Sequence, residues 1–311
     1  MSTYYYSHPD CLDHVTPYGH PEQVARLKAI ATALSDASFE SLIRCEAPLA
    51  DEDDLLLCHP QSYIDRITGA VPLSGSVPLD ADTHMSPGSL KAALRAVGGT
   101  IAAVDSVVDG SAANAFVGCR PPGHHAEAET PMGFCLFGNV AIAAKHAVQR
   151  RGLSRVAVVD FDVHHGNGTQ DLLWEEARTL FITSQQMPLW PGTGDPSERG
   201  AHDNVINIPL APGTGGVEMR RAYEGRVFPA LEEFRPELIL VSAGFDAHRD
   251  DPLASLNWET EDFAWLTRRL CDIAADCCDG RVVSTLEGGY DLTALGQSVA
   301  AHVKVLMERG G

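Results

Sequence analysis

Two kinds of hydrophobic pattern alternate along most of the chain. Short runs that are apolar at successive positions and rich in β-branched residues occur at 115–119, 155–163, 180–184, 205–210, 238–245 and 281–289. Such runs are typical of strands that are buried on both faces of a parallel sheet. Longer segments with apolar residues at helical spacing lie at 89–108, 138–152, 219–234 and 260–278. The alternation predicts an α/β fold in which right-handed crossovers place helices on the faces of the sheet.

The pattern also predicts a single domain that spans residues 1–311. No linker rich in proline, serine or glycine divides the chain, and the sequence has no internal repeat. The loops at 184–204 and 210–216 each follow a predicted strand. Because they are longer than most connections, we expect them to carry functional residues.

Composition and charge narrow the classes of function. Hydrophobic residues make up 44% of the chain and charged residues 21%, which is typical of a globular protein. No segment approaches the roughly 20 apolar residues of a membrane span. The 42 acidic and 23 basic residues give a formal charge of −19, which argues against nucleic acid and anionic membranes as partners and favours cationic ligands. The same charge is also typical of proteins that are acidic merely for solubility.

The start of the sequence and its cysteines favour a reducing compartment. The start, MSTYYYSHPD, is polar and aromatic, unlike a signal peptide, so we expect a cytoplasmic protein. The eight cysteines include no CxxC pair and are expected to be reduced thiols. We interpret the adjacent Cys277 and Cys278 as packing residues on a helix.

Residues of the types that bind metal ions follow two of the predicted strands. The first group is Asp160, Asp162, His164, His165 and Asn167, and the second is Asp246, His248, Asp250 and Asp251. Open parallel sheets bind ligands beyond the carboxyl ends of their strands. One residue separates Asp162 from His164, so an extended backbone would place both side chains on one side. Together with Asp246 they would hold a divalent ion such as Zn²⁺ and leave coordination positions for water and substrate, as in a catalytic site.

Two adjacent histidines form a second candidate feature. Neighbouring side chains on a regular strand or helix point in different directions. Pro121, Pro122 and Gly123 precede His124 and His125 and make the backbone irregular there. We therefore expect both imidazoles to approach one small site.

Several motifs resemble those of the zinc-dependent histone deacetylases and their prokaryotic amidohydrolase relatives. RPPGHHA, DFDVHHGNGTQ, PGTGD, SAGFDAH and EGGYD occur in that family's order, and GHPEQVARL matches its early segment. The resemblance covers most of the chain. It implies one histone deacetylase-like catalytic domain with the arginase-deacetylase fold, a parallel sheet of about eight strands flanked by helices. It also implies hydrolysis of an N-acyl amide, such as the acetyl-lysine side chain.

The resemblance implies which residues bind metal ions. Asp162, His164 and Asp246 match the zinc ligands, and Fe²⁺ suits the same ligand types. Members of the family often also bind K⁺ as a structural ion. Its ligands would be backbone oxygens near Asp160, Asp162 and His164 and the side chain near Ser184.

The resemblance also assigns the catalytic roles. His125 matches the general base that later acts as acid, while His124 matches the histidine that acts mainly electrostatically. Tyr290 matches the tyrosine that hydrogen-bonds the substrate carbonyl. Asp160 fits the partner of His124, and Asn167 fits the partner of His125, where class I enzymes carry Asp and class II-like members carry Asn. A neutral amide stabilises an imidazolium less than a carboxylate does, so His125 is expected to be readily neutral.

A further set of residues is implied for substrate binding: Asp82, Gly133, Phe134, Trp190, Leu253, Gly288 and Gly289. Asp82 resembles a rim carboxylate that accepts a hydrogen bond from the substrate backbone. Gly133, Phe134 and Trp190 resemble the walls of a narrow acyl-lysine tunnel. Arg26 resembles a buried arginine beneath the site, and a structural ion pair is the alternative. Each of these positions also has a simple packing or turn interpretation.

The sequence is also compared with two other functions. A binuclear manganese ureohydrolase would need Asp where this chain has Gly166 and His248. A non-catalytic acyl-ligand binder would lack a base, a ligand or the tyrosine, all of which are present. Polyamine-selective members often carry an acidic residue at the position of Leu253. The expected substrate is therefore a small-molecule or peptide acyl amide that is cationic or lysine-like. An acetylpolyamine or another small amide is the alternative. The sequence also leaves open whether the protein forms homo-oligomers.

Overall fold

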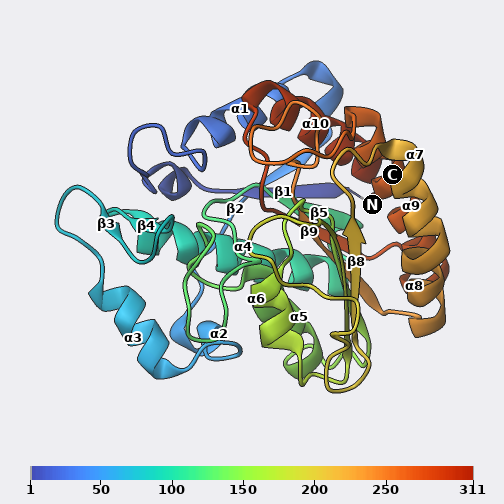
Figure 1. The fold of residues 1–311 in the computed structure, drawn as a ribbon, viewed down its shortest axis with the longest axis horizontal. Helices are drawn as coiled ribbons and strands as arrows, with labels where there is room; N and C mark the ends of the chain where they lie inside the picture. Colours follow the sequence, from blue (N-terminus) through green and yellow to red (C-terminus); the bar gives the residue numbers. More distant parts are fainter. Residues whose placement is uncertain (1, 311) are drawn as a thin grey trace.

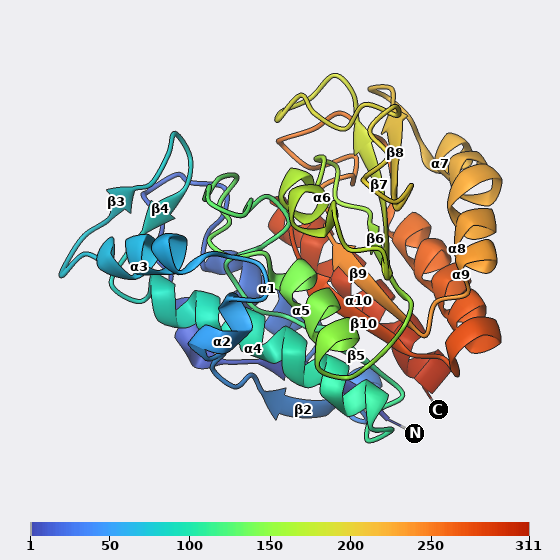
Figure 2. The same cartoon turned by 90° about the horizontal axis from the view of Figure 1, so that it is seen from below.

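An eight-stranded sheet forms the centre of the molecule, and all of its strands are parallel (Figures 1 and 2). The computed structural model describes residues 2–310. The strands, in spatial order, are β2 (Ile43–Glu46), β1 (Thr3–Ser7), β5 (Asn114–Val117), β10 (Val282–Leu286), β9 (Leu238–Ala243), β6 (Val156–Asp160), β7 (Thr179–Gln186) and β8 (Val205–Leu210). A separate antiparallel pair consists of β3 (Val77–Pro78) and β4 (His84–Met85).

Helices cover both faces of the sheet (Figure 2). On one face lie α4 (Ser89–Val108), α5 (Asn139–Gln149) and α6 (Asn167–Leu173), with the short α2 (Glu52–Leu55) and α3 (Gln61–Gly69) beyond them. On the other face lie α1 (Ala25–Ala33), α9 (Thr260–Cys278) and α10 (Leu292–Gly310), followed outward by α7 (Gly216–Ala222) and α8 (Phe228–Phe234). The central strands are apolar on both faces and are fully buried, as the sequence pattern predicts.

The predicted α/β fold is confirmed, and all six predicted strands belong to the sheet. The bounds of β8, α4 and α9 coincide with the predicted 205–210, 89–108 and 260–278. Cys277 and Cys278 lie at the end of α9, and all eight cysteines are free thiols. Among the described residues, none of the helices combines the length and the apolar character that a membrane crossing requires.

The segment 219–234 is helical, as its apolar spacing predicts, but the helix is irregular. The segment forms α7, a π-helical turn at Tyr223–Val227, and then α8. Pro229 lies in the first turn of α8 and has no N–H to donate to the preceding turn. The interruption therefore falls where a regular hydrogen-bond ladder would fail, and the wider turn accommodates it.

The topology decides where a functional site can form. Because the strands are parallel, the loops that follow β5, β6, β9 and β10 leave the sheet at one edge. These four strands are adjacent at the centre of the sheet, and the loops after them contain the two histidines, both groups of metal-ligand residues and Tyr290.

Candidate active site

Three candidate metal ligands converge at the carboxyl ends of β6 and β9. Asp162, His164 and Asp246 are buried, and they offer one ligand atom each within 4.8 Å of one another. His164 Nδ1 lies 3.1 Å from Asp162 Oδ1 and 3.2 Å from Asp246 Oδ2. The structure therefore brings together the three side chains that the sequence nominates as one cluster.

The predicted extended backbone at this cluster is wrong. β6 ends at Asp160, and residues 162–164 form a bend. Asp160 Oδ1 accepts the N–H of Asp162 at 3.0 Å, and Asp162 Oδ1 accepts the N–H of His164 at 2.9 Å. These local side-chain bonds to the backbone bring Asp162 and His164 to one side, in place of the alternation of a strand.

The cluster fits a divalent cation. Among the described residues, the buried Asp246 Oδ2 accepts no well-oriented hydrogen bond. Burial lowers the pKa of His164, but the hydrogen bonds and charges of Asp162 and Asp246 outweigh it and raise that pKa to about 10. The two carboxylates therefore favour positive charge at this position. Two oxygen ligands and one nitrogen ligand suit Zn²⁺ or Fe²⁺ and leave coordination positions open.

The two adjacent histidines lie in contact and differ in their partners. Their ring centroids are 3.9 Å apart. His124 Nδ1 lies 2.9 Å from Asp160 Oδ2, and His125 Nδ1 lies 2.8 Å from Asn167 Oδ1. Asp160 ends β6 and Asn167 begins α6, at the two ends of one loop. Each imidazole therefore lies against the partner that the sequence analysis expects for it.

The surroundings of the two imidazoles shift their pKa values in opposite directions. Burial opposes protonation of His124, yet the charges of Asp162 and Asp160 outweigh it and raise the pKa of His124 well above its ordinary value. Burial, followed by the charges of His124 and His164, holds the pKa of His125 well below its ordinary value. Such a pair supplies a fixed positive charge beside a neutral imidazole that can accept a proton.

The loop after β10 locks the histidine turn in place. Glu287 Oε2 accepts the backbone N–H groups of Gly123 at 2.7 Å and His124 at 3.1 Å. Arg26, which is fully buried, donates to the carbonyl oxygens of Glu287 at 2.5 Å and Gly289 at 2.7 Å. Arg26 therefore supports this loop from beneath.

Tyr290 completes the polar groups at this edge. Its ring lies 5.0 Å from the Arg26 guanidinium carbon and 5.9 Å from the ring of Phe134. Burial raises the pKa of the Tyr290 phenol well above its ordinary value, so the hydroxyl is protonated and can donate a hydrogen bond.

This arrangement agrees with the comparison with known proteins. Residues 20–306 match the histone deacetylase domain family. The chain belongs to the histone deacetylase family. It is similar to a histone deacetylase-like amidohydrolase of Pseudomonas aeruginosa, 39% identical over 88% of this chain and 73% of that protein. It is also similar to a probable deacetylase of Archaeoglobus fulgidus, 38% identical over 92% and 80% of the two chains.

The fold comparison gives the same result. A crystal structure of an HDA15 HD domain superimposes with a TM-score of 0.93 at 32% identity, covering 99% of this chain and 89% of that one. The arginase-deacetylase fold expected from the motifs is thus confirmed. Histone deacetylases are generally zinc-dependent hydrolases, and the three converging ligands of this chain fit that chemistry.

In this member of the histone deacetylase family, a cavity of about 240 Å³ opens beside these groups. It is lined by Pro21, Asp82, His125, Gly133, Phe134, His164, Leu189, Trp190, Leu253 and Tyr290. Five of the residues nominated for substrate binding therefore lie on the cavity that also exposes the candidate base, a metal ligand and the tyrosine. Gly288 and Gly289 are not among its lining residues. The N–H of Gly288 instead donates to Asp162 Oδ2 at 2.8 Å, so it supports a metal ligand from behind.

Gly133 is required by close packing in the cavity wall. Its φ is +56°, and a Cβ atom there would lie 2.4 Å from His125 Cδ2 and 2.7 Å from Trp190 Cη2. The rings of His125 and Trp190 are consequently free to stand with their centroids 4.7 Å apart. Any larger residue would push the candidate base or the tunnel wall aside.

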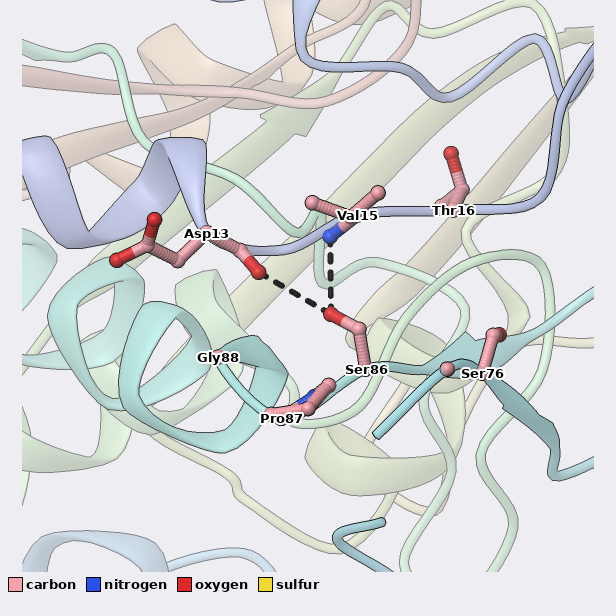
Figure 3. Close-up of a pocket in the computed structure, with 8 residues that line it drawn as sticks. Asp13, Val15, Thr16, Ser76, Ser86, Pro87 and Gly88 are labelled. Atoms are coloured by element: carbon pink, nitrogen blue, oxygen red, sulfur yellow. Dashed lines mark hydrogen bonds between the residues drawn. The ribbon is translucent and has the colours of Figure 1, made fainter. Parts of the chain in front are cut away.

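A larger hollow of the surface is a different feature. It measures about 690 Å³ and lies between the segment after β1 and the segment around β4 (Figure 3). Its central polar group is satisfied within the protein, because Ser86 Oγ accepts from the N–H of Val15 at 2.9 Å and donates to the carbonyl of Asp13 at 3.1 Å. None of the nominated site residues lines it.

Asp251 belongs to the second predicted group of metal-ligand types, but its carboxylate instead accepts the N–H of Tyr290. Three other residues at this site are absent from the sequence prediction: Pro21 and Leu189 line the cavity, and Glu287 fixes the histidine turn. Their positions inside or beside the motifs are the only available signal. Pro21 lies in GHPEQVARL, Leu189 precedes Trp190, and Glu287 is the first acidic residue after a buried strand.

Proposed function

We propose that this member of the histone deacetylase family hydrolyses the acetyl amide of N-acetyl-lysine side chains to acetate and the free amine. The main support is one relationship: His125, His164 and Tyr290 share a single cavity with the apolar walls Phe134 and Trp190. A base, a metal-ligand cluster and a hydrogen-bond donor thus face the space that an extended acyl-lysine stem would occupy.

Each residue of the site has a separate role in the proposed hydrolysis. Bound at Asp162, His164 and Asp246, Zn²⁺ would supply Lewis-acid chemistry that polarises an amide carbonyl and acidifies water. His125, held neutral by burial, accepts the proton of the attacking water and then delivers it to the leaving amine. Tyr290 donates a hydrogen bond to the carbonyl oxygen as negative charge develops on it. His124, paired with Asp160, contributes positive charge nearby.

Charge and cavity shape support a lysine-like substrate. Asp82 lies on the cavity and is half-buried, and the whole chain carries a formal charge of −19, which favours a cationic peptide. Leu253 lines the cavity at the position where polyamine-selective relatives often carry an acidic residue. An apolar residue there suits the methylene stem of lysine better than a second ammonium group.

The test measures acetate release from a panel of substrates. The panel contains acetyl-lysine peptides, acetylpolyamines and small aryl acetamides, each assayed with the zinc-loaded enzyme and with chelator. We expect the highest kcat/KM for acetyl-lysine peptides, and loss of all activity with chelator. The variant L253E should shift the preference towards acetylpolyamines. Higher kcat/KM for acetylpolyamines in the unmodified enzyme, or urea release from arginine with two Mn²⁺ bound, would overturn the proposal.

Other expectations of the sequence analysis stay predictions. These are a K⁺ ion beside Asp160, Asp162, His164 and Ser184, a cytoplasmic location, the absence of nucleic-acid and membrane partners, and self-association. In the structure, Ser184 Oγ lies 2.7 Å from the hydroxyl of Tyr223. A K⁺ ligand role for Ser184 would have to coexist with that hydrogen bond.

A further inference from the structure

The side-chain amide of Asn167 lies between an imidazole and a carboxylate. Its Oδ1 is 2.8 Å from His125 Nδ1, and its Nδ2 donates to Glu127 Oε1 at 2.8 Å. Asn167 is buried, and its Nδ2 has two weaker contacts, with the carbonyl of His125 at 3.4 Å and Met132 Sδ at 3.3 Å. Glu127 is therefore the strong partner that faces the amide from the side opposite His125.

The carboxylate of Glu127 decides which way the amide points. A carboxylate accepts hydrogen bonds and does not donate them, so it binds the NH₂ group and repels the carbonyl oxygen. If the amide of Asn167 were turned by 180°, its oxygen would face a carboxylate oxygen at hydrogen-bond distance. With Glu127 in place, the oxygen of Asn167 is held towards His125.

This orientation fixes the tautomer of His125. A carbonyl oxygen facing Nδ1 accepts a hydrogen bond, so the proton of the neutral imidazole is on Nδ1 and the lone pair is on Nε2. A turned amide would donate to Nδ1 and place the proton on Nε2, where it would block proton acceptance. We propose that Glu127 is a positioning residue that acts through Asn167 to keep His125 in the base-competent tautomer; this rests on the proposed role of His125 as base.

The backbone around Glu127 has its own supports. The N–H of Glu127 donates to the carbonyl of Thr130 at 3.0 Å, and the N–H of Ala128 donates to Asp171 Oδ2 at 2.9 Å. The carbonyl of Ala128 lies 3.1 Å from His59 Nδ1. Since these bonds do not involve the Glu127 side chain, its replacement should leave the turn folded.

Glu127 does not face the substrate cavity. It lines a separate hollow of about 200 Å³ together with Asn167, Gln170 and Thr193. Asn167 thus separates this hollow from the cavity that exposes His125. Because Glu127 is not among the residues that line that cavity, removal of its side chain should lower kcat and leave KM unchanged.

The first test compares substitutions at Glu127 with one at an exposed neighbour. E127A removes the acceptor and should lower kcat about tenfold, the loss expected for one charge-assisted hydrogen bond. The amide of E127Q can accept a hydrogen bond from Asn167 or donate one to it, so E127Q should lose less kcat than E127A. E129Q alters a side chain that is exposed to solvent and should match the unmodified enzyme. Zinc content and Tm are measured for each, and a kcat of E127A within twofold of the unmodified enzyme would overturn the proposal.

A double substitution separates this role from general support of the fold. In N167D, the new carboxylate would face Glu127 at hydrogen-bond distance and be repelled by it. Adding E127Q to N167D should then raise kcat at least fivefold, although E127Q alone does not raise it. A merely structural Glu127 would give the same effect in both backgrounds, and that result would contradict the proposal.

A spectroscopic readout keeps this inference distinct from the proposed reaction. Long-range ¹H–¹⁵N spectra of histidine-labelled protein report the tautomer of each imidazole, and the H125Q spectrum assigns His125. We expect an Nδ1-protonated ring in the unmodified protein, an Nε2-protonated or mixed population in E127A, and a smaller shift of the same kind in E127Q. An unchanged tautomer in E127A would overturn the inference even if acetyl-lysine is cleaved. A shifted tautomer without any amide hydrolysis would uphold it and refute the proposed function.

Discussion

The carboxylate of Asp251 accepts the backbone N–H of Tyr290 at 2.7 Å. Its second oxygen accepts the N–H of Leu253 at 3.0 Å. One buried side chain therefore fixes both the position of the candidate hydrogen-bond donor and one wall of the substrate cavity. This link joins the loop after β9 to the loop after β10.

Removing this carboxylate should misplace Tyr290. D251A leaves two backbone donors without their acceptor, which costs about 1–3 kcal/mol each if they stay buried. We expect kcat to fall roughly ten- to a hundredfold. D251N retains one acceptor oxygen and should lose less. Steady-state kinetics check this, with D250N as control because the Asp250 side chain is 65% exposed. Equal losses in D250N and D251A would contradict the positioning role.

Replacing the hydroxyl of Tyr290 should affect turnover alone. Y290F removes the donor that would stabilise the developing oxyanion, and such donors contribute about 10²–10³ in kcat. The ring packing against Phe134 and Arg26 is retained, so Tm and zinc content should not change. Kinetics combined with metal analysis make the check. An unchanged kcat in Y290F would rule out the assigned role.

The chemistry-bearing residues at strand ends could be predicted because their types and their topology are both visible in the sequence. Asp162, His164 and Asp246 follow strongly apolar runs, and a parallel sheet brings such ends to one edge. The approach of Asp162 and His164 nevertheless does not come from the extended backbone that the spacing predicts. The bend depends on hydrogen bonds from backbone N–H groups to side chains, which no alternation pattern reveals.

The supporting residues could not be predicted, because their roles depend on contacts between distant segments. Glu22 and Arg120 form a buried ion pair, although 98 positions separate them in the sequence. Glu127 and Asp251 act only through the loops that fold against them. The edge strand β2 is mostly exposed and polar, so it lacks the apolar signal of the central strands.

Zinc should stabilise the unmodified protein but not the variant D246N. Burial and the charge of Asp162 raise the pKa of Asp246, so the metal-free protein is destabilised by this carboxylate. D246N should therefore be at least as stable as the unmodified protein in chelator. With zinc at a hundredfold its Kd, only the unmodified protein should gain about 2.7 kcal/mol. Thermal melts check this, and a zinc response retained in D246N would contradict the ligand assignment. D250N, changed at an exposed carboxylate, should retain the response.

Substitutions at two glycines distinguish the effect of a steric clash from the effect of backbone strain. Both Gly133 (φ +56°) and Gly192 (φ +83°) lie in the left-handed region, but only a Cβ at Gly133 would clash, with His125 and Trp190. G133A should lower kcat about a hundredfold, since a displacement near 1 Å of a catalytic group can have that effect. G192A shares the strain and has open space, so its kcat should stay within threefold. The kcat of each variant is measured under conditions in which the same fraction of the protein is folded. Similar losses of kcat in both variants would contradict the steric argument.

The buried His302 should make stability fall in acid. Its Nδ1 lies 2.6 Å from Thr267 Oγ1 and its Nε2 lies 2.9 Å from Ser284 Oγ. Burial lowers the pKa of His302 to about 3, whereas an imidazole in an unfolded chain titrates near pH 6.5. Between these pH values the unfolded chain binds a proton that the folded protein does not. His302 therefore stabilises the fold fully above about pH 6.5, and this contribution is lost progressively as the pH falls towards 3, by up to about 1.4 kcal/mol per pH unit.

The variant H302Q tests this slope. Glutamine can hydrogen-bond both hydroxyls and does not titrate, so the free energy of unfolding should fall less steeply with pH between 6.5 and 4. Urea unfolding at several pH values measures it, with chelator present because the metal ligands also titrate. H202Q, changed at an exposed histidine, should keep the slope of the unmodified protein. If the free energy of unfolding depends on pH equally in H302Q and in the unmodified protein, the prediction is contradicted. His302 would then bind its proton in the folded state as readily as in the unfolded chain.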